Sequence, residues 1–169
     1  MISFESDYNN GMLPEILEAL GKTNSEKTSG YGFDPYSKAA KEKIRKAVGN
    51  ENADVFFLVG GTQTNTTVID SLLLGCEGVI CVETGHIEVH ESGAVEAFGH
   101  KVIPLPGENS KLSSSTLAVY MDSFLADETH PHMVQPGMVY ISMPTEFGMV
   151  YTQEELTALY ATCQKYGLR

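Results

Sequence analysis

The sequence predicts an α/β fold, in which crossover helices join the strands of a mostly parallel sheet. Two observations support this prediction. From Asp54 onward, short apolar runs rich in β-branched residues alternate with segments of helical periodicity. The chain also has 169 residues, 42% of them hydrophobic, which is typical of one globular domain.

The opening part of the chain, residues 1–50, predicts an arm, a loop and a helix. Apolar residues recur at helical spacing over Leu13–Leu20, and Pro14 stands near the start, so a short amphipathic helix is expected there. The segment Gly30–Pro35 is too rich in glycine and proline for the interior of an element. A basic helix is expected to follow over Ser37–Val48, closed by Gly49.

Residues 51–169 are expected to form the sheet domain. Its candidate strands are Val55–Val59, Gly78–Val82, Lys101–Leu105 and Val139–Ser142. Its candidate helices are Thr64–Leu74, Val89–Phe98, Ser114–Phe124 and Thr152–Tyr166. The last helix begins close to a capping-box pattern and is followed by Gly167, after which a further strand is expected. The sheet domain is therefore predicted to be incomplete, although a small complete domain is the alternative.

Composition excludes several classes of function. A net charge of -11 and a pI near 4.8 oppose binding to nucleic acid, because phosphates are repelled by such a surface. The apolar runs are too short to span a bilayer, and the first residues lack a secretion signal, so a cytoplasmic protein without a membrane partner is expected. The three cysteines lack Cys-x-x-Cys spacing, which favours reduced packing residues over a disulfide or a zinc site.

A glycine turn follows the first candidate strand. Gly60 and Gly61 precede Thr62, Gln63 and Thr64, and a helix is expected to begin there. Free amide groups and the positive end of a helix dipole would meet at this turn, and the threonine hydroxyls would add donors, which suits a phosphate dianion. Such turns also occur in α/β proteins for packing reasons alone, so the motif leaves both interpretations open.

A polar segment, Glu83–Ala94, follows the second candidate strand, where an open parallel sheet places its ligands. His86 and His90 stand four residues apart, but the His-Glu-x-x-His pattern of a zinc site is absent, so no metal site is predicted. An imidazole at a strand end can instead stack on a heteroaromatic ring or carry a proton.

Together these segments resemble the threonine aldolase and β-eliminating lyase family of pyridoxal-phosphate enzymes. The resemblance covers the whole chain, and its motifs follow one another in the family's order and spacing. They are Ser6-Asp7, Gly30-Tyr31-Gly32-x-Asp34-Pro35, Gly61-Thr62-Gln63-x-Asn65, Glu83-x-Gly85-His86, Glu91-x-Gly93-Ala94, Thr145 and Glu154-Glu155-Leu156.

The resemblance implies the front part of an aspartate-aminotransferase-like large domain that binds pyridoxal phosphate. It assigns cofactor binding to Gly61, Thr62, Gln63 and His86, substrate binding to Ser6 and Tyr31, and catalysis to His86 and His132. The implied reaction splits threonine or allo-threonine into glycine and acetaldehyde. The implied assembly is a homo-oligomer, a dimer or tetramer, in which the Tyr31 loop lies near a neighbouring subunit's active site.

Several parts of the family's machinery have no match in residues 1–169. The Schiff-base lysine, the aspartate that pairs with the pyridine nitrogen and the later arginines are expected beyond Arg169, so the chain alone is expected to be inactive. Lys101 and Lys111 do not match the family lysine and are expected to be solvated surface charges. The alternatives are another pyridoxal-phosphate lyase or aminotransferase, or a non-catalytic domain that binds a phosphorylated ligand or a partner subunit.

Overall fold

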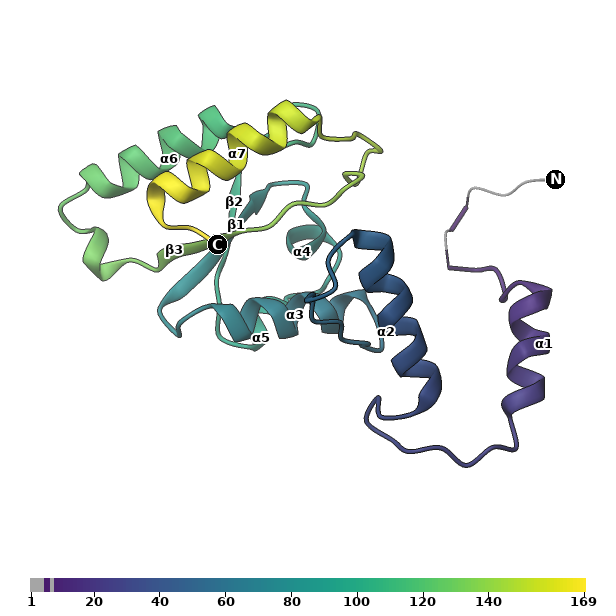
Figure 1. Ribbon diagram of the computed structural model, residues 1–169. Coiled ribbons are helices and arrows are strands. Elements are labelled where there is room, and N and C mark those ends of the chain that lie inside the picture. Colours follow the sequence, from purple (N-terminus) through teal and green to yellow (C-terminus); the bar gives the residue numbers. More distant parts are fainter. Residues whose placement is uncertain (1–4, 7) are drawn as a thin grey trace. The chain divides into compact units, whose positions relative to one another are not determined.

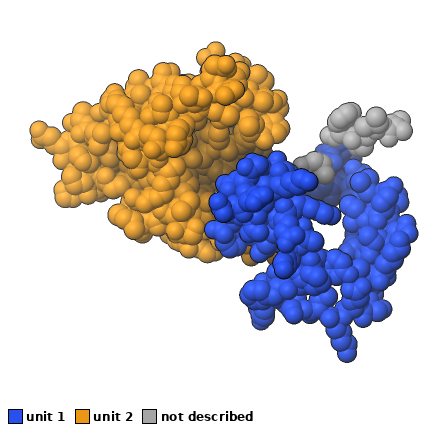
Figure 2. Space-filling view, viewed as in Figure 1, with its two compact units in different colours: residues 1–57 blue, residues 58–169 orange. Residues whose placement is uncertain are grey.

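The computed structural model describes residues 5, 6 and 8–169, which form two compact units. Figure 2 colours these units, residues 1–57 and residues 58–169. In the first unit the structure has two helices, α1 (Pro14–Thr23) and α2 (Pro35–Val48). Both confirm helices expected from the sequence, and each extends two or three residues beyond an expected boundary.

Helix α2 is closed at both ends by local interactions that its sequence provides. The Asp34 carboxylate accepts a hydrogen bond from the Ser37 amide at 2.8 Å, which satisfies an amide of the first turn. At the other end Gly49 adopts φ +67°, a left-handed conformation that glycine adopts without strain. The predicted closure by Gly49 is therefore confirmed.

The second unit is built on a three-stranded parallel sheet. Its strands β1 (Glu77–Val82), β2 (Val102–Leu105) and β3 (Gln135–Val139) lie in the order β2-β1-β3. Its helices are α3 (Gly61–Leu72), α4 (His86–Val89), α5 (Ala94–Ala97), α6 (Ser114–Ala126) and α7 (Gln153–Tyr166), with a 3-10 turn η1 (His130–His132) before β3. The predicted α/β architecture with crossover helices is confirmed.

The central strand β1 is buried on both faces, which explains its continuous apolar run. Ile80 and Val82 pack in one hydrophobic cluster with residues of α6 and α7, whereas Val79 and Cys81 pack in a second cluster with residues of α3, α4 and α5. Figure 1 shows the two groups of helices on opposite sides of the sheet. Burial of Cys81 and Cys163 agrees with the packing role expected of the cysteines, but Cys76 is exposed.

Two predictions of secondary structure, one helix and one strand, are wrong. The helix expected over Val89–Phe98 is two short helices, because Ser92 and Gly93 adopt φ +53° and +74° between them. Left-handed residues cannot continue a right-handed helix. The strand expected over Val55–Val59 is absent, because within the described residues this segment pairs with none of the three strands of the sheet. The strand expected over Val139–Ser142 lies earlier in the chain, over Gln135–Val139, and shares only Val139 with the expected range.

The chain turns back onto β3 after α7. Gly167 adopts φ +70° at the end of the helix, and Leu168 is buried. The Arg169 amide then donates to the Gly137 carbonyl at 3.0 Å, and the Val139 amide donates to the Arg169 carbonyl at 2.9 Å. This is the hydrogen-bond pattern of parallel strands, and it fits the strand expected after Gly167.

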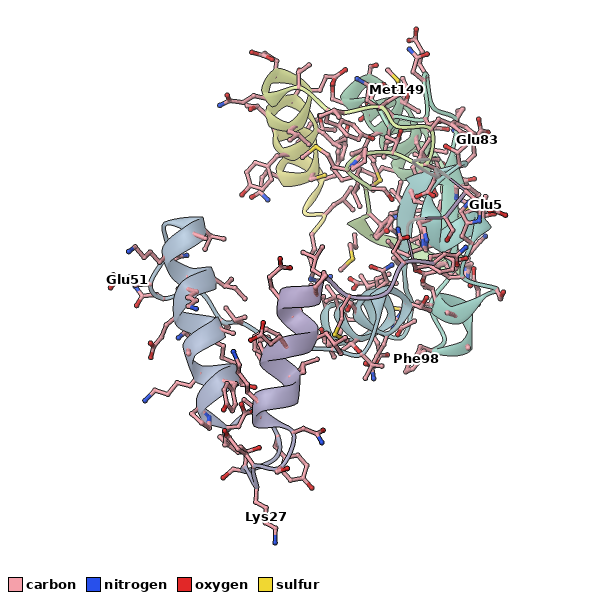
Figure 3. All side chains as sticks on the ribbon, turned by 90° about the vertical axis from the view of Figure 1, so that its right-hand side faces the viewer. Glu5, Lys27, Glu51, Glu83, Phe98 and Met149 are labelled. Atoms are coloured by element: carbon pink, nitrogen blue, oxygen red, sulfur yellow. The ribbon has the colours of Figure 1, made fainter. Side chains whose placement is uncertain are left out.

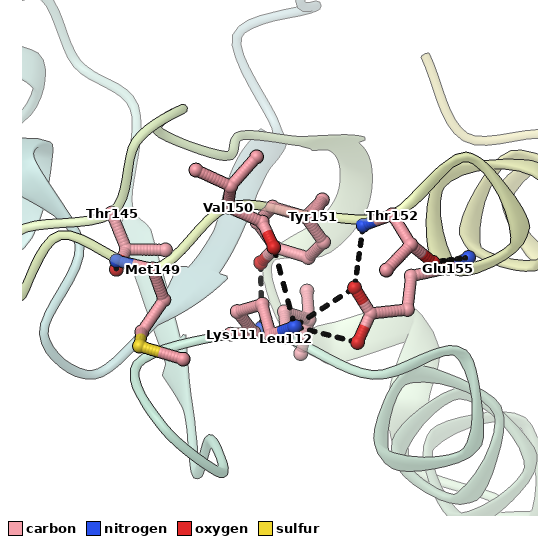
Figure 4. Close-up of polar contacts among 8 residues, drawn as sticks. All are labelled: Lys111, Leu112, Thr145, Met149, Val150, Tyr151, Thr152 and Glu155. Carbon is pink, nitrogen blue, oxygen red and sulfur yellow. Dashed lines mark hydrogen bonds and ion pairs between the residues drawn. The ribbon is translucent and has the colours of Figure 1, made fainter.

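A polar latch joins the loop after β2 to the start of α7 (Figure 4). The Lys111 ammonium donates to both carboxylate oxygens of Glu155, at 2.6 and 2.8 Å, and the Leu112 amide donates to the Tyr151 hydroxyl at 2.8 Å. Glu155 also completes a capping box with Thr152. Lys111 is thus largely buried in an ion pair, so the expectation of a solvated surface charge is wrong for this lysine.

The latch predicts a pH-dependent stability. The hydrogen bond from Lys111, followed by that from the Thr152 amide, lowers the pKa of Glu155 below its ordinary 4.5. A lowered pKa contributes stability above pH 4.5 that is lost as the pH falls through the lower folded-state value. Glu155→Gln is therefore expected to unfold at lower urea concentration than the parent chain near neutral pH, and the difference should shrink below pH 4.5.

Glu128→Gln is the matched control, because Glu128 is exposed and makes no hydrogen bond within the described residues. Urea midpoints measured near neutral pH and at about pH 3.5 should be alike for this variant and the parent. A Glu155→Gln difference that is equally large at both pH values would contradict the role given to the Lys111–Glu155 pair.

Candidate functional site

The candidate site begins where β1 ends. Glu83, labelled in Figure 3, is the first residue after this strand, and Gly85 makes the turn into α4. The Gly85 amide donates to the Val82 carbonyl at 2.7 Å, and a Cβ at this position would lie 2.9 Å from the same oxygen. Only glycine fits so close to the strand. The tight turn places His86 as the first residue of α4, just beyond the carboxyl end of β1.

A buried carboxylate holds His86 beside α3. One oxygen of Glu91, Oε1, lies 2.9 Å from His86 Nδ1 and accepts a hydrogen bond from Asn65 Nδ2 at 2.6 Å. The Glu91 side chain is 0% exposed, whereas the His86 side chain is 40% exposed. Asn65 belongs to the first turns of α3, four residues after Gly61. The structure therefore brings His86 and the beginning of α3 together through one shared acceptor.

Two buried polar side-chain atoms have no hydrogen-bond partner among the described residues. They are the second oxygen of Glu91, Oε2, and the Thr84 hydroxyl. Leaving a buried polar group unsatisfied costs about 1–3 kcal/mol, and more for a charged group. Folding stability alone therefore does not explain this carboxylate, and a role in a site does.

The beginning of α3 presents free amide groups. Its first helical hydrogen bond runs from the Thr64 amide to the Gly60 carbonyl at 3.0 Å. The amides of residues 61–63 precede this bond, and no side chain caps the helix. Three donors and the positive end of the helix dipole are thus available to an anion.

Neither conformation nor crowding requires the two glycines of this turn. Gly60 adopts φ -168°, an extended backbone open to any residue. A Cβ on either Gly60 or Gly61 would meet no atom within 4 Å, in contrast to Gly85. The packing explanation that the sequence left open therefore finds no support in the described residues. Bare backbone with open space in front of it is what a closely bound ligand requires.

The side chains of the turn differ in their availability. The Thr64 hydroxyl donates to the Gly60 carbonyl at 2.9 Å, so it is not the free donor expected from the sequence. The Gln63 side-chain oxygen accepts from the Val59 amide at 2.9 Å. The Thr62 hydroxyl makes no hydrogen bond within the described residues. Thr62 and the three amides are therefore the donors that remain.

The segment after β3 adds two residues that the sequence analysis did not assign to the site. Glu146 Oε2 lies 3.7 Å from His90 Nε2, and the His90 ring is 5.6 Å from the His86 ring. Thr145 is buried, and its hydroxyl accepts from the Met149 amide at 3.1 Å. Both residues follow a parallel strand, so their position at the carboxyl edge of the sheet could have pointed to them.

The remaining predicted residues lie elsewhere. His132 ends the turn before β3 and thus lies at the amino edge of the parallel sheet, opposite to His86, so the structure does not bring the two histidines together. Ser6 and Tyr31 belong to the first unit, and their substrate role stays a prediction. Asp7, the neighbour of Ser6 in its motif, lies outside the described residues.

Sequence comparison places the chain in a family. Residues 3–169 match the sequence profile of the β-eliminating lyases. The chain belongs to the β-eliminating lyase family. This result confirms the resemblance seen in the glycine turn and the His86 segment.

Individual members of the β-eliminating lyase family agree with this assignment. The chain is 34% identical over 167 residues to a low specificity L-threonine aldolase of a Pseudomonas species, and 32% identical to that of Pseudomonas aeruginosa. Each alignment covers 98% of this chain and 47% of the relative. The structure of a Leishmania major threonine aldolase matches with a TM-score of 0.89 and 39% identity, over 96% of this chain and 46% of that one. The chain thus spans about half the length of these proteins.

Among the described residues, no helix is both long and apolar enough to cross a membrane. No cluster of three or more histidine, cysteine, aspartate or glutamate side chains within the described part could hold a metal ion.

The open glycine turn predicts a stability result. Gly61→Ala should leave the free energy of unfolding unchanged or raise it by about 0.5–1 kcal/mol, because alanine favours the helix and meets no neighbour. Gly85→Ala should lower it by about 1–3 kcal/mol, since its methyl group would collide with the Val82 carbonyl. Urea denaturation of both variants checks the contrast. A loss of stability in Gly61→Ala as large as that in Gly85→Ala would mean that folding requires both glycines.

Proposed function

We propose that this chain forms the cofactor-phosphate-binding part of a pyridoxal-phosphate-dependent lyase that splits a β-hydroxy amino acid. Threonine or allo-threonine would give glycine and acetaldehyde. One observation carries the proposal: the uncapped amides of residues 61–63 lie on the same helix as Asn65, which shares a buried acceptor with His86. Family membership and the printed names of the relatives, threonine aldolases, support the same function.

The residues present fit pyridoxal phosphate. Its phosphate group would accept hydrogen bonds from the amides of Gly61, Thr62 and Gln63 and from the Thr62 hydroxyl. The half-exposed imidazole of His86 offers a flat face for the pyridine ring. The absence of a Cβ at Gly60 and Gly61 leaves the backbone open to a bulky anion.

The residues of this chain would then direct the chemistry. When bound, the cofactor supplies an electron sink that allows a bond at the substrate Cα to break heterolytically. His86 would take the proton of the substrate hydroxyl as a general base. Ser6 would hold the substrate carboxylate and so fix which bond lies perpendicular to the ring. For His132, its place at the opposite edge of the sheet gives no support to a catalytic role.

We infer that the lysine that binds the cofactor covalently lies outside residues 1–169. The second unit contains three lysines, Lys101, Lys111 and Lys165. Lys101 precedes β2 and so lies at the amino edge of the sheet, whereas Lys111 is paired with Glu155. Lys165 lies near the end of α7 and donates to the Tyr166 hydroxyl. The pyridine-nitrogen aspartate and the carboxylate-binding arginines are proposed to lie with the missing lysine.

Assembly of several copies in the cytoplasm completes the proposal. Large apolar side chains of the Val55–Val59 segment are exposed, Phe56 by 78% and Val59 by 96%, which favours contact with further polypeptide. The unpaired cysteines agree with a reducing compartment.

Titration with the cofactor tests the binding site directly. In a ¹H–¹⁵N NMR spectrum of the chain, pyridoxal 5′-phosphate should shift the amide signals of Gly61, Thr62 and Gln63, because its phosphate would accept their hydrogen bonds. Pyridoxal without the phosphate is the matched control and should leave these signals in place. Shifts spread over lysine-rich α2 and absent from residues 61–63 would overturn the proposed site.

The substrate is tested on the full-length protein. With L-threonine or L-allo-threonine we expect acetaldehyde, measured by coupled reduction. With tyrosine, release of ammonia would instead indicate another lyase of the family.

Gly61→Ala should weaken cofactor binding while stability is kept, since its methyl group would stand beside the amides. Unchanged cofactor affinity in this variant would contradict the close approach of the phosphate.

A further inference from the structure

We propose that Glu91 is a positioning residue that fixes the tautomer and the plane of the His86 imidazole. By accepting a hydrogen bond from the Nδ1–H group, it leaves Nε2 as the unprotonated nitrogen of the half-exposed ring. The purpose of this arrangement rests on the proposed function, in which His86 acts as a base. The geometry itself is independent of any cofactor.

The hydrogen-bonding capacity of a carboxylate decides the tautomer. An ionised carboxylate only accepts hydrogen bonds, so the nitrogen that lies 2.9 Å from Glu91 Oε1 must carry a proton. A neutral imidazole has one proton, so Nε2 then has a free lone pair. Which ring nitrogen is protonated is commonly set by such a bond to the other nitrogen. Without that bond, histidine in water favours the opposite tautomer, with the proton on Nε2.

Glu91 is itself held in one place. Its Oε1 also accepts from Asn65 Nδ2 at 2.6 Å, and its side chain is fully buried. Asn65 lies on α3, whose first-turn amides form the proposed phosphate site. A single oxygen of Glu91 thus connects the His86 imidazole to α3, the helix that would hold the phosphate. The orientation of the imidazole is therefore coupled to the position of α3.

Packing alone would not call for a carboxylate here. Glu91 Oε2 is buried without a partner in the described residues, which costs stability. Replacing a buried charged group by an apolar one of similar volume is often neutral or stabilising. His86 and Asn65 are both partly exposed, so water could satisfy them in such a variant. The other ionisable groups close to His86 do not substitute for Glu91, because Glu146 pairs with His90 on the neighbouring ring.

The tautomer is measured by long-range ¹H–¹⁵N correlation NMR on the full chain at alkaline pH, where imidazoles are neutral. The parent chain should show His86 protonated at Nδ1. Glu91→Gln keeps an acceptor oxygen and should keep this pattern, whereas Glu91→Leu should shift His86 to the Nε2-protonated form. Glu88→Gln, an exposed carboxylate of α4, is the matched control and should match the parent.

The inference would be overturned if His86 were protonated at Nε2 in the parent chain, or at Nδ1 in Glu91→Leu. Loss of the Nδ1 proton in Glu91→Gln would also overturn it, because the acceptor would then not be the determinant. The parent spectrum decides the tautomer assignment even if Glu91→Leu fails to fold, and Glu91→Gln then tests the dependence on an acceptor.

A kinetic readout separates this inference from the proposed function. In the full-length protein, Glu91→Leu should lower kcat by roughly 10²–10⁴-fold with a small change in KM, and Glu91→Gln should restore most of it. If the parent protein has no aldolase activity, the proposed function fails while the tautomer result stands. If activity is present but unaffected by Glu91→Leu, the positioning role fails while the proposed function stands.

Discussion

Parallel pairing of β1 with β2 and β3 is the constraint on which the rest of the second unit depends. Because all three strands run the same way, their carboxyl ends meet at one edge. The segments that follow β1 and β3 both leave the sheet at that edge, and the contact between His90 and Glu146 joins them. Helix α3 lies against α5 on the same side of the sheet, and Asn65 connects it to this edge.

The structure distinguishes glycines that folding requires from glycines that leave room for a ligand, which the sequence alone could not do. A glycine turn before a helix occurs in many α/β proteins, and its meaning depends on what surrounds it. Here Gly85 is required by the close approach of a carbonyl, whereas Gly60 and Gly61 border open space. Glycine is thus required for folding at the start of α4, whereas at the start of α3 it leaves the backbone accessible to a ligand. Burial of Glu91 with one oxygen unpaired supports a functional origin for the cluster.

Much of the fold could be predicted because its signals are local. A continuous apolar run predicts the central strand β1, and a capping box and a closing glycine predict α7. Other predictions failed for reasons that local sequence patterns do not contain. The left-handed turn at Ser92 and Gly93 interrupts an otherwise helical pattern, and the Val55–Val59 run finds no partner strand within the described residues. Lys111 is paired through a contact with Glu155, 44 residues away.

The sequence indicated individual residues of the candidate site, but it did not indicate the hydrogen bonds that connect them. His86 and the turn at Gly61 could be proposed from their positions at element ends, and their roles in binding stay predictions. The link through Glu91 joins residues 26 positions apart, and no periodicity reveals it. His132 shows the converse, because alignment by resemblance placed it in the site while the direction of β3 places it at the other edge.

The central claim is that the amides of residues 61–63 receive the phosphate of pyridoxal phosphate beside His86. A crystal structure of the chain with this cofactor tests it most directly. The account predicts phosphate oxygens within hydrogen-bonding distance of the Gly61 and Thr62 amides, with the pyridine ring lying flat against the His86 imidazole. A cofactor bound elsewhere on the chain, with those amides left free, would contradict it.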